Sequence, residues 1–251
     1  KYTSGAKTII VNRLSFSKGV LMSIEEEKKG AAVYACRFVK DGHIVGLGSG
    51  STAVYFVEEL GRRIKREKMG ILAIPSSYQI AQVAIKAGVP LTTLREHPEV
   101  DIDVDGADEV DPHLNLIKGG GGSLTNEKII AQAAKRLIII VDHTKMVRRL
   151  GSKFPVPVEV LPEADRFVYG RLKDIGGVPK LRYFGGNGGK VPFITEHRNF
   201  ILDTKFPEIL NPKQLGIEIK SIAGVVEHGI FHGMADLVCV GSKREVKILR
   251  K

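Results

Sequence analysis

Through the first 150 residues, short apolar runs alternate with stretches in which apolar residues recur at helical spacing. The runs that predict strands cover residues 44–46, 71–74, 100–104 and 137–141. The intervening helices are expected from Thr52, from Tyr78 and over residues 126–135. Strands that alternate with helices are typical of a parallel sheet covered by helices, and the wholly apolar run at 137–141 is typical of a strand buried on both faces. The pattern predicts an α/β fold.

After the Phe154–Pro157 segment the order of elements changes. It becomes strand, helix over 163–174, two strands around a loop at Gly185–Gly189, helix over 212–219, and strand over 225–227. This βαββαβ order is that of the split βαβ arrangement. Residues 234–251 then resume apolar strand patterns, and we expect them to rejoin the first sheet.

The start of the folded region is marked by a change near Met22. The first 21 residues carry four positive charges and no acid, whereas Ser23 followed by Glu26 is a capping box that predicts a helix to about Val39. We therefore expect a poorly ordered basic leader over residues 1–21. The predicted domains are 22–153 with 224–251, and 154–223.

Composition restricts the class of protein. The formal net charge is +10, but the densest basic run, at residues 62–68, has no interleaved aromatic residue and the chain has no Trp, so a nucleic-acid partner is not expected. The longest apolar runs fall short of the 18 or so residues of a membrane span, and no secretory signal is recognisable, so we expect a cytoplasmic protein with no membrane partner. Cys36 and Cys239 lie in apolar surroundings and are expected to be buried thiols.

Polar or glycine-rich residues follow each of the four predicted strands. They are Ser49–Thr52, Pro75–Ser77, Asp105–Asp108 and Asp142–Lys145. Open α/β sheets bind ligands at the carboxyl edge of their strands. The four segments together predict one ligand site at that edge.

The stretch from Asp105 to Glu127 has the most unusual composition. It holds five carboxylates, one lysine (Lys118) and four consecutive glycines, and residues 101–111 contain six acids without a Lys or Arg. Consecutive glycines lose much backbone entropy on folding, so Gly119–Gly122 indicates close approach of the backbone to a ligand, with a flexible surface loop as the alternative.

Glu127 falls in the first turn of a helix, where the helix terminus favours its carboxylate and burial favours its acid form. A glutamate at this position is most often only a helix-start residue.

Gly46–Thr52 resembles a nucleotide-binding loop but lacks the third glycine of a dinucleotide fingerprint and the lysine of a P-loop. A glycine turn with two hydroxyls at a helix N-terminus suits a single phosphate, and a plain tight turn is the alternative.

Metal binding is not expected. Asp101, Asp103 and Asp105 with Gly106 match the start of a calcium loop, but position 12 is Pro112 and the apolar residues between the acids alternate as in a strand. His228 and His232 have the i, i+4 spacing of helical metal ligands, but the glycine that follows each makes a helix improbable, so both are assigned structural roles.

Five motifs in this order and spacing closely resemble ribose-5-phosphate isomerase of the A type. They are Gly46–Thr52, Asp105–Glu109, Lys118–Gly121, Leu124–Lys128 and Phe154–Glu159, and the match runs from about Met22 to the C-terminus. The resemblance implies a Rossmann-like sheet domain with a smaller ferredoxin-like domain inserted before the last strands, no cofactor, and a homodimer or homotetramer. It implies the interconversion of ribose 5-phosphate and ribulose 5-phosphate through an enediolate, in the non-oxidative branch of the pentose phosphate pathway.

The resemblance also implies residue roles. Glu127 matches the general base, while Asp105, Asp108 and Lys118 match residues that assist ring opening and stabilise the charged oxygens. The remaining positions that match substrate-binding residues are Lys28, Ser49, Gly50, Ser51, Thr52, Gly106, Ala107, Gly119, Gly120, Gly121 and Lys145. The chain departs from the family in its basic leader and in the Gly185–Gly189 loop, both outside the motifs.

Two other functions are weighed against isomerase activity. One is a non-catalytic sugar-phosphate sensor of the repressor type, which should carry a helix-turn-helix segment for which 21 residues before Met22 are too few. The other is a related enzyme, an amino-sugar phosphate deaminase or a CoA transferase. The pattern from Lys118 to Glu127 argues against both.

Overall fold

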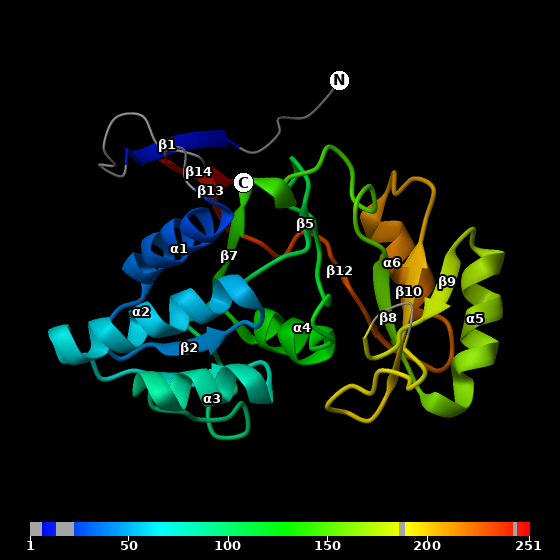
Figure 1. The fold of residues 1–251 in the computed structure, drawn as a ribbon, viewed down its shortest axis with the longest axis horizontal. Coiled ribbons are helices and arrows are strands. Elements are labelled where there is room, and N and C mark those ends of the chain that lie inside the picture. The colour runs from blue at the N-terminus through cyan, green and yellow to red at the C-terminus, as the bar shows by residue number, and fades with distance from the viewer. Residues whose placement is uncertain (1–6, 14–22, 186–188, 243–244) are drawn as a thin grey trace.

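The computed structural model shows two lobes side by side, each built on its own sheet (Figure 1). It describes residues 7–13, 23–185, 189–242 and 245–251. No helix in these ranges is both long enough and apolar enough to cross a membrane.

The larger lobe is a seven-stranded sheet in the order β1-β14-β13-β7-β4-β2-β3. Its strands are β1 (Lys7–Arg13), β2 (Ile44–Leu47), β3 (Leu72–Pro75), β4 (Ile102–Asp105), β7 (Leu137–Asp142), β13 (Leu237–Ser242) and β14 (Glu245–Arg250). The five strands from β3 to β13 are parallel, and β14 and β1 add antiparallel at one edge. The predicted parallel sheet and the return of the C-terminal residues to it are confirmed.

Four helices cover this sheet. They are α1 (Ile24–Ala35), α2 (Ser51–Glu67), α3 (Tyr78–Ala87) and α4 (Leu124–Ala133), and a short 3₁₀ turn, η1 (Cys36–Phe38), follows α1. Residues 102 and 104 of β4 share a core with α1 and α2, so residues 103 and 105 of the same strand face the opposite side, where α4 lies. The capping box at Ser23 and Glu26 is present at the start of α1, as predicted. Cys36 and Cys239 are buried free thiols.

The N-terminal segment differs from the prediction. Lys7–Arg13 forms β1, which pairs with β14 from Lys7 opposite Arg250 to Arg13 opposite Glu245. The expectation of a poorly ordered leader therefore does not hold for these seven residues. Its β-branched run, Thr8–Val11, suits a strand, and β14 would otherwise be an unpaired edge. Residues 1–6 and 14–22 lie outside the described part of the chain.

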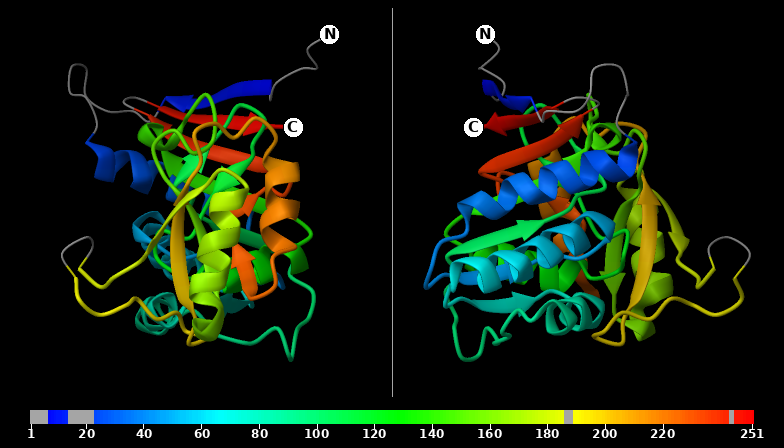
Figure 2. Two further views of the ribbon diagram at one scale, coloured as in Figure 1. Left: turned by 90° about the vertical axis from the view of Figure 1, so that its right-hand side faces the viewer. Right: turned by 60° about the vertical axis from the view of Figure 1, so that its left-hand side comes forward.

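The smaller lobe is a four-stranded antiparallel sheet in the order β11-β8-β10-β9. Its elements are β8 (Val156–Val160), η3 (Pro162–Ala164), α5 (Asp165–Asp174), β9 (Val178–Leu181), β10 (Phe200–Lys205), α6 (Pro212–Lys220) and β11 (Val225–His228). The left view of Figure 2 shows α5 and α6 side by side on the outer face of this sheet. The predicted split βαβ arrangement is confirmed, but β11 extends the small sheet to His228, past the boundary predicted at residue 223. Residues 186–188 of the Gly185–Gly189 loop are not described.

Three strands of two residues each form a further sheet that the sequence did not predict. They are β5 (Glu109–Val110), β6 (Leu116–Ile117) and β12 (Ile230–Phe231), in the order β12-β6-β5. Two-residue strands are too short to show an alternating pattern. This sheet positions Lys118 at the end of β6 and connects β11 of the small lobe to β13 of the large one.

Candidate active site

One cavity lies at the carboxyl edge of β2, β4 and β7, where the sequence predicts a ligand site. Its lining residues come from five stretches of the sequence: Ser49, Gly50, Ser51, Thr52, Gly106, Ala107, Asp108, Lys118, Gly119, Gly120, Gly121, Glu127 and Lys145. All of them belong to the predicted set. Asp105 lies directly beneath the cavity in contact with Lys118.

A buried charge cluster forms the floor of the cavity. Lys118 Nζ lies 2.7 Å from Asp105 Oδ2 and 3.1 Å from Glu127 Oε2, and it donates a 2.7 Å hydrogen bond to Gly106 O. The Ser49 hydroxyl donates a 2.5 Å hydrogen bond to the other Glu127 oxygen. Lys118 and Glu127 are 2% and 4% exposed, so bulk water screens their interaction little. The acid and the ammonium group that the sequence singled out therefore meet at one point.

The electrostatics of this cluster follow from its burial. Burial raises the pKa of Asp105, and although Lys118 lowers it, the charge of Glu127 raises it again, so that the pKa stands at about 7. Burial opposes the charge on Lys118, but Asp105 and Glu127 outweigh that effect and raise the lysine pKa above its usual value. Burial also raises the pKa of Asp108. Lys118 is therefore a permanent cation, and Asp105 exchanges its proton near neutral pH.

Asp103 lies deeper on the same face of β4, and sequence reasoning did not assign it to the site. It is 1% exposed, and among the described residues neither of its carboxyl oxygens has a hydrogen-bond partner. A Cβ at Gly46 would lie 2.6 Å from its Oδ1, so the neighbouring strand also approaches it closely. Burial, and then the charge of Asp105, raises the pKa of Asp103 well above its usual value.

Asp103→Asn is expected to stabilise the protein increasingly as the pH rises from 5 to 7. Above the ordinary aspartate pKa the unfolded chain releases the proton while the folded chain retains it, so the wild type loses up to about 1.4 kcal/mol of unfolding free energy per pH unit until the raised pKa is reached. Asn has no such proton to lose. Urea unfolding of both proteins at pH 5 and pH 7 measures the difference.

The control for this prediction is Asp101→Asn. Asp101 accepts a hydrogen bond from Ile44 N and pairs with Lys135, and these partners lower its pKa. Its contribution to the free energy of unfolding is therefore nearly complete by about pH 5, so the substitution should give nearly the same loss at both pH values. An equal effect of Asp103→Asn at pH 5 and 7 would show that Asp103 is not held protonated by the fold.

The opposite wall of the cavity is suited to an anion. Helix α2 begins at Ser51, its N-cap Gly50 has φ +93°, no side chain caps it, and its first turn contains no acid. Its first backbone N–H groups therefore face the cavity with the positive end of the helix dipole. Lys145 lies in η2 (His143–Lys145), whose N-cap Asp142 accepts a 2.9 Å hydrogen bond from Thr144 N.

The glycine loop is held from two directions. Gly119 and Gly122 have φ values of +106° and +88°, which favour glycine. Gly120 N donates a 2.8 Å hydrogen bond to Asp108, and Arg182 of the small lobe donates to Gly119 O at 2.9 Å and to Gly120 O at 3.2 Å. Arg182 is itself paired with Asp203. The sequence carried no signal for Arg182, because its contact with the loop spans more than 60 residues and arises from domain packing.

Several predicted residues do not join the cavity lining. Lys28 Nζ pairs with Glu25 at 2.7 Å instead. The Pro75–Ser77 segment ends a strand at the same edge, but Ser77 serves as the N-cap of α3. His228 and His232 lie outside the cavity and outside any helix, as predicted; His232 Nδ1 lies 2.8 Å from Asn115 Oδ1.

Within the described ranges, one group of acids and histidine is close enough to hold a metal ion. Glu27, Asp142 and His143 offer ligand atoms within 4.8 Å of one another, outside the cavity lining. His143 Nδ1 lies 2.5 Å from Glu27 Oε2, and Asp142 caps η2, so two of the three groups are hydrogen-bonded to each other and the third to a neighbouring turn.

Comparison with known proteins agrees with this geometry. The family described as ribose 5-phosphate isomerase A (phosphoriboisomerase A) matches residues 72–245. Ribose-5-phosphate isomerase A of Pyrococcus abyssi is 48% identical over 231 residues, covering 92% of this chain and all of the relative. The enzyme of that name from Methanothermobacter thermautotrophicus is also 48% identical, over 89% of this chain and 97% of its own length.

Solved structures are similar over the same extent. Ribose 5-phosphate isomerase A of Methanocaldococcus jannaschii superposes with a TM-score of 0.86 at 45% identity, covering 91% of this chain and all of that one. A D-ribose-5-phosphate isomerase in complex with phospho-erythronic acid superposes with a TM-score of 0.88 at 44% identity, covering 92% and 100%. The motifs, the two-lobed fold and these full-length similarities agree: the chain belongs to the ribose-5-phosphate isomerase A family.

Proposed function

We propose that the chain interconverts D-ribose 5-phosphate and D-ribulose 5-phosphate by moving a proton between C2 and C1. The observation that carries this proposal is the convergence of Glu127, Lys118 and the glycine loop on one cavity that also has an anion-binding wall. A solved relative with phospho-erythronic acid bound supports a phosphorylated sugar acid or sugar as the kind of ligand.

The substrate phosphate is placed against the anion-binding wall. There the N–H groups of Gly50–Thr52 and the hydroxyls of Ser51 and Thr52 donate hydrogen bonds, and Lys145 supplies a positive charge. The N–H and hydroxyl of Ser49 already donate to Asp105 and Glu127. The sugar chain then extends toward Glu127 and Lys118 on the far side of the cavity. Asp105, with a pKa of about 7, is suited to exchange a proton with the sugar hydroxyl or ring oxygen when the ring opens.

Glu127 acts as the base in the open-chain sugar. It takes the C2 proton, the C2–H electrons form the C1–C2 double bond, and the carbonyl oxygen becomes the enediolate oxygen. Lys118 and the glycine-loop N–H groups stabilise that oxygen, as donors do in an oxyanion hole. The proton of the C2 hydroxyl passes to the C1 oxygen, Glu127 returns its proton to C1, and the electrons left on the C2 oxygen form the new carbonyl. The isomerisation is then complete with no net change in protons or electrons.

The alternatives lose support from the comparisons. The relatives and structures reported above are named isomerases and are covered over nearly their whole lengths, which favours catalysis over a sugar-phosphate sensor and isomerisation over deamination or CoA transfer. A homodimer or homotetramer and the absence of a cofactor remain predictions from the resemblance, and a cytoplasmic location remains a prediction from the sequence.

The function is tested by incubating the purified protein with ribose 5-phosphate, without added metal or nucleotide, and measuring ribulose 5-phosphate. We expect the aldose and ketose to reach equilibrium from either side. Failure to form the ketose would contradict the proposed function.

Lys145→Ala is expected to raise KM for ribose 5-phosphate by about tenfold or more, because one charge-assisted phosphate contact contributes about 1.5–3 kcal/mol, while kcat changes little. Steady-state kinetics measures KM and kcat separately. The exposed Lys173 of α5 provides a matched control, since Lys173→Ala removes the same charge far from the cavity. An unchanged KM in Lys145→Ala would remove this lysine from the phosphate site.

A further inference from the structure

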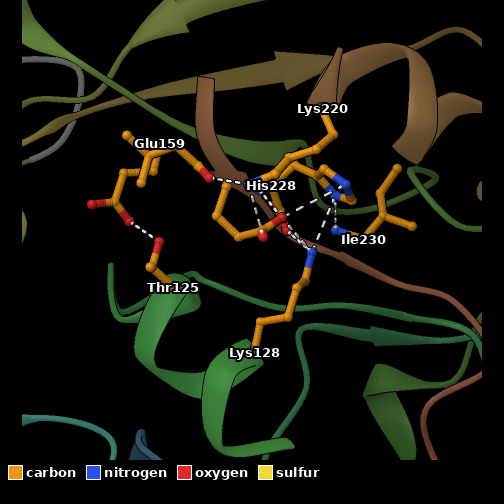
Figure 3. Close-up of polar contacts among 8 residues, drawn as sticks. Thr125, Lys128, Glu159, Lys220, His228 and Ile230 are labelled. Atoms are coloured by element: carbon orange, nitrogen blue, oxygen red, sulfur yellow. Dashed lines mark hydrogen bonds and ion pairs between the residues drawn. The ribbon is translucent and has the colours of Figure 1, made fainter. Parts of the chain in front are cut away.

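The first turn of α4 has two functional faces. Glu127 faces the cavity, whereas Thr125 and Lys128, three residues apart, share a face that points at the small lobe. Figure 3 shows both side chains reaching from the helix toward β8 and β11. The helix that carries the proposed base is therefore attached to the other lobe on both sides of that base.

Lys128 makes the more extensive of the two attachments. Its Nζ lies 2.9 Å from Glu227 Oε1, donates to His228 O, and lies 4.7 Å from the centre of the Phe231 ring. The residue is 6% exposed. All three partners belong to the segment that leaves the small sheet through β11 and β12.

Thr125 makes the second attachment. Its hydroxyl donates to Glu159 Oε2 on β8, and Glu159 is fully buried. The other Glu159 oxygen accepts hydrogen bonds from Thr195 Oγ1 at 2.8 Å and Asn199 Nδ2 at 2.9 Å. The acceptor of Thr125 is thus fixed by the small lobe itself.

The same segment that holds Lys128 also holds Lys118. Lys118 N donates a 2.9 Å hydrogen bond to Gly229 O, and Gly229 N donates to Pro157 O at 2.7 Å. Lys118 Nζ lies 5.4 Å from the Phe231 ring, against whose face Lys128 also lies. Residues 228–231 therefore contact the base helix through Lys128 and the catalytic lysine through its backbone, and so define the spacing of Glu127 and Lys118.

Stability alone gives a poor reason for this arrangement. Burying an ammonium and a carboxylate costs several kcal/mol per ion, and apolar replacements of buried ion pairs are often neutral or stabilising. A buried, hydrogen-bonded pair does, however, fix one geometry.

We propose that Lys128 is a positioning residue for the isomerisation: by binding Glu227 and the His228 carbonyl, it holds the first turn of α4 so that Glu127 lies correctly against Lys118 and the substrate. This inference rests on the proposed function.

The charged and titratable groups around Lys128 give the proposal a pH signature. Burial lowers the pKa of Lys128 to about 8 even though Glu227 opposes the effect. Burial and then Lys128 lower the pKa of His228 to about 3, and the pKa of Glu227 is about 2 because Lys128 outweighs the effect of burial. The remaining charged or titratable groups that line the groove beside Lys128 are Lys213, Lys220 and His232. Above pH 8 Lys128 loses its proton, so its ion pair with Glu227 is lost and turnover should fall.

The experiment compares Lys128→Met with Lys220→Met in the wild-type background. Lys220 is exposed and binds the same Glu227 at 3.2 Å, and among the described residues its hydrogen bonds and ion pairs go to Val226 and Glu227 and not to α4. Because misplacement of a reacting group by about 1 Å costs about 10²-fold in rate, Lys128→Met should lower kcat by about 10- to 100-fold. KM should stay within about twofold, since the phosphate wall is untouched. The decline in kcat above pH 8 should be absent from this variant. Lys220→Met should resemble the wild type in kcat and keep the alkaline decline, displaced to higher pH because the charge of Lys220 lowers the pKa of Lys128.

The outcomes separate the inference from the function on which it rests. A wild type that forms no ribulose 5-phosphate contradicts the proposed function. An active wild type with an equally active, folded Lys128→Met variant overturns the positioning role, as does a variant that loses thermal stability but keeps kcat and the alkaline decline. If Lys128→Met does not fold, Glu227→Gln and Lys128→Arg are used. Glu227→Gln should lower kcat, whereas Lys128→Arg, which keeps the positive charge, should retain most of the wild-type kcat. Wild-type kcat in Glu227→Gln would overturn the proposal.

Discussion

Glu127→Gln is expected to lower turnover by ~10²–10⁴-fold, the contribution of a general base, while substrate binding is retained. Gln has the same shape and still accepts a hydrogen bond from the Ser49 hydroxyl, but it does not accept the C2 proton. The phosphate wall of Gly50–Thr52 and Lys145 is unchanged. Steady-state kinetics with ribose 5-phosphate gives kcat, and calorimetric titration with phospho-erythronic acid gives the binding constant.

The matched control is Glu163→Gln, an exposed glutamate in η3 of the small lobe, which should have wild-type kinetics. Near-normal turnover in Glu127→Gln would exclude Glu127 as the base. Loss of both turnover and ligand binding would indicate that the substitution disrupts the cavity rather than the proton transfer.

Lys118→Met is expected to lower turnover by ~10²–10³-fold, because removal of one donor to a developing oxyanion costs about 2.7–4 kcal/mol. The ammonium group of Lys118 contacts both Asp105 and Glu127, and no other Lys or Arg of the described chain forms an ion pair with either acid. Kinetics should be measured together with thermal unfolding, because loss of one partner of a buried pair costs about 3–5 kcal/mol of stability.

A double substitution separates these two effects. Lys118→Met with Asp105→Asn removes the buried cation and the carboxylate closest to it, so unfolding temperature should recover relative to Lys118→Met alone. Turnover should not recover, because the donor to the enediolate is still missing and Asn at position 105 cannot exchange a proton during ring opening. Recovery of turnover together with stability would show that Lys118 acts through folding, and not on the reaction.

Much of the fold is predictable because local signals agree with it. The Ser23 and Glu26 capping box marks the start of α1, and the apolar runs at residues 44–46 and 137–141 lie within parallel strands of the large sheet. The change in the order of strands and helices after Pro157 predicts the small lobe, because its elements are long enough to show the hydrophobic periodicity of a strand or a helix.

Elements that depend on a distant partner were not predicted. Lys7–Arg13 pairs with the edge strand β14, and the basic composition of residues 1–21 led us to overlook its β-branched run, which suits a strand. The β5, β6 and β12 strands are two residues long and take their conformation from one another.

The site residues also divide into those that local sequence motifs predict and those that depend on distant partners. Ser49, Lys118 and Glu127 were found because they lie in motifs at the carboxyl edge of the sheet. The sequence presents Asp103 as part of an acidic run and of a rejected calcium-loop match, since its lack of partners is visible only once the packing of β2 and α4 against it is known. Arg182 and Lys128 act across the two lobes, and nothing in a local stretch of sequence indicates which distant backbone a side chain will reach.

The central claim is that Glu127 moves a proton while Lys118 holds the enediolate in the same cavity. The most direct test is NMR of ribose 5-phosphate incubated in D₂O with the wild type and with Glu127→Gln. The account predicts ribulose 5-phosphate carrying solvent deuterium at C1 with the wild type, and neither ketose nor deuterium above the uncatalysed level with Glu127→Gln. Ketose that stays free of deuterium at C1 through many turnovers near equilibrium, or an equally active Glu127→Gln variant, would contradict it.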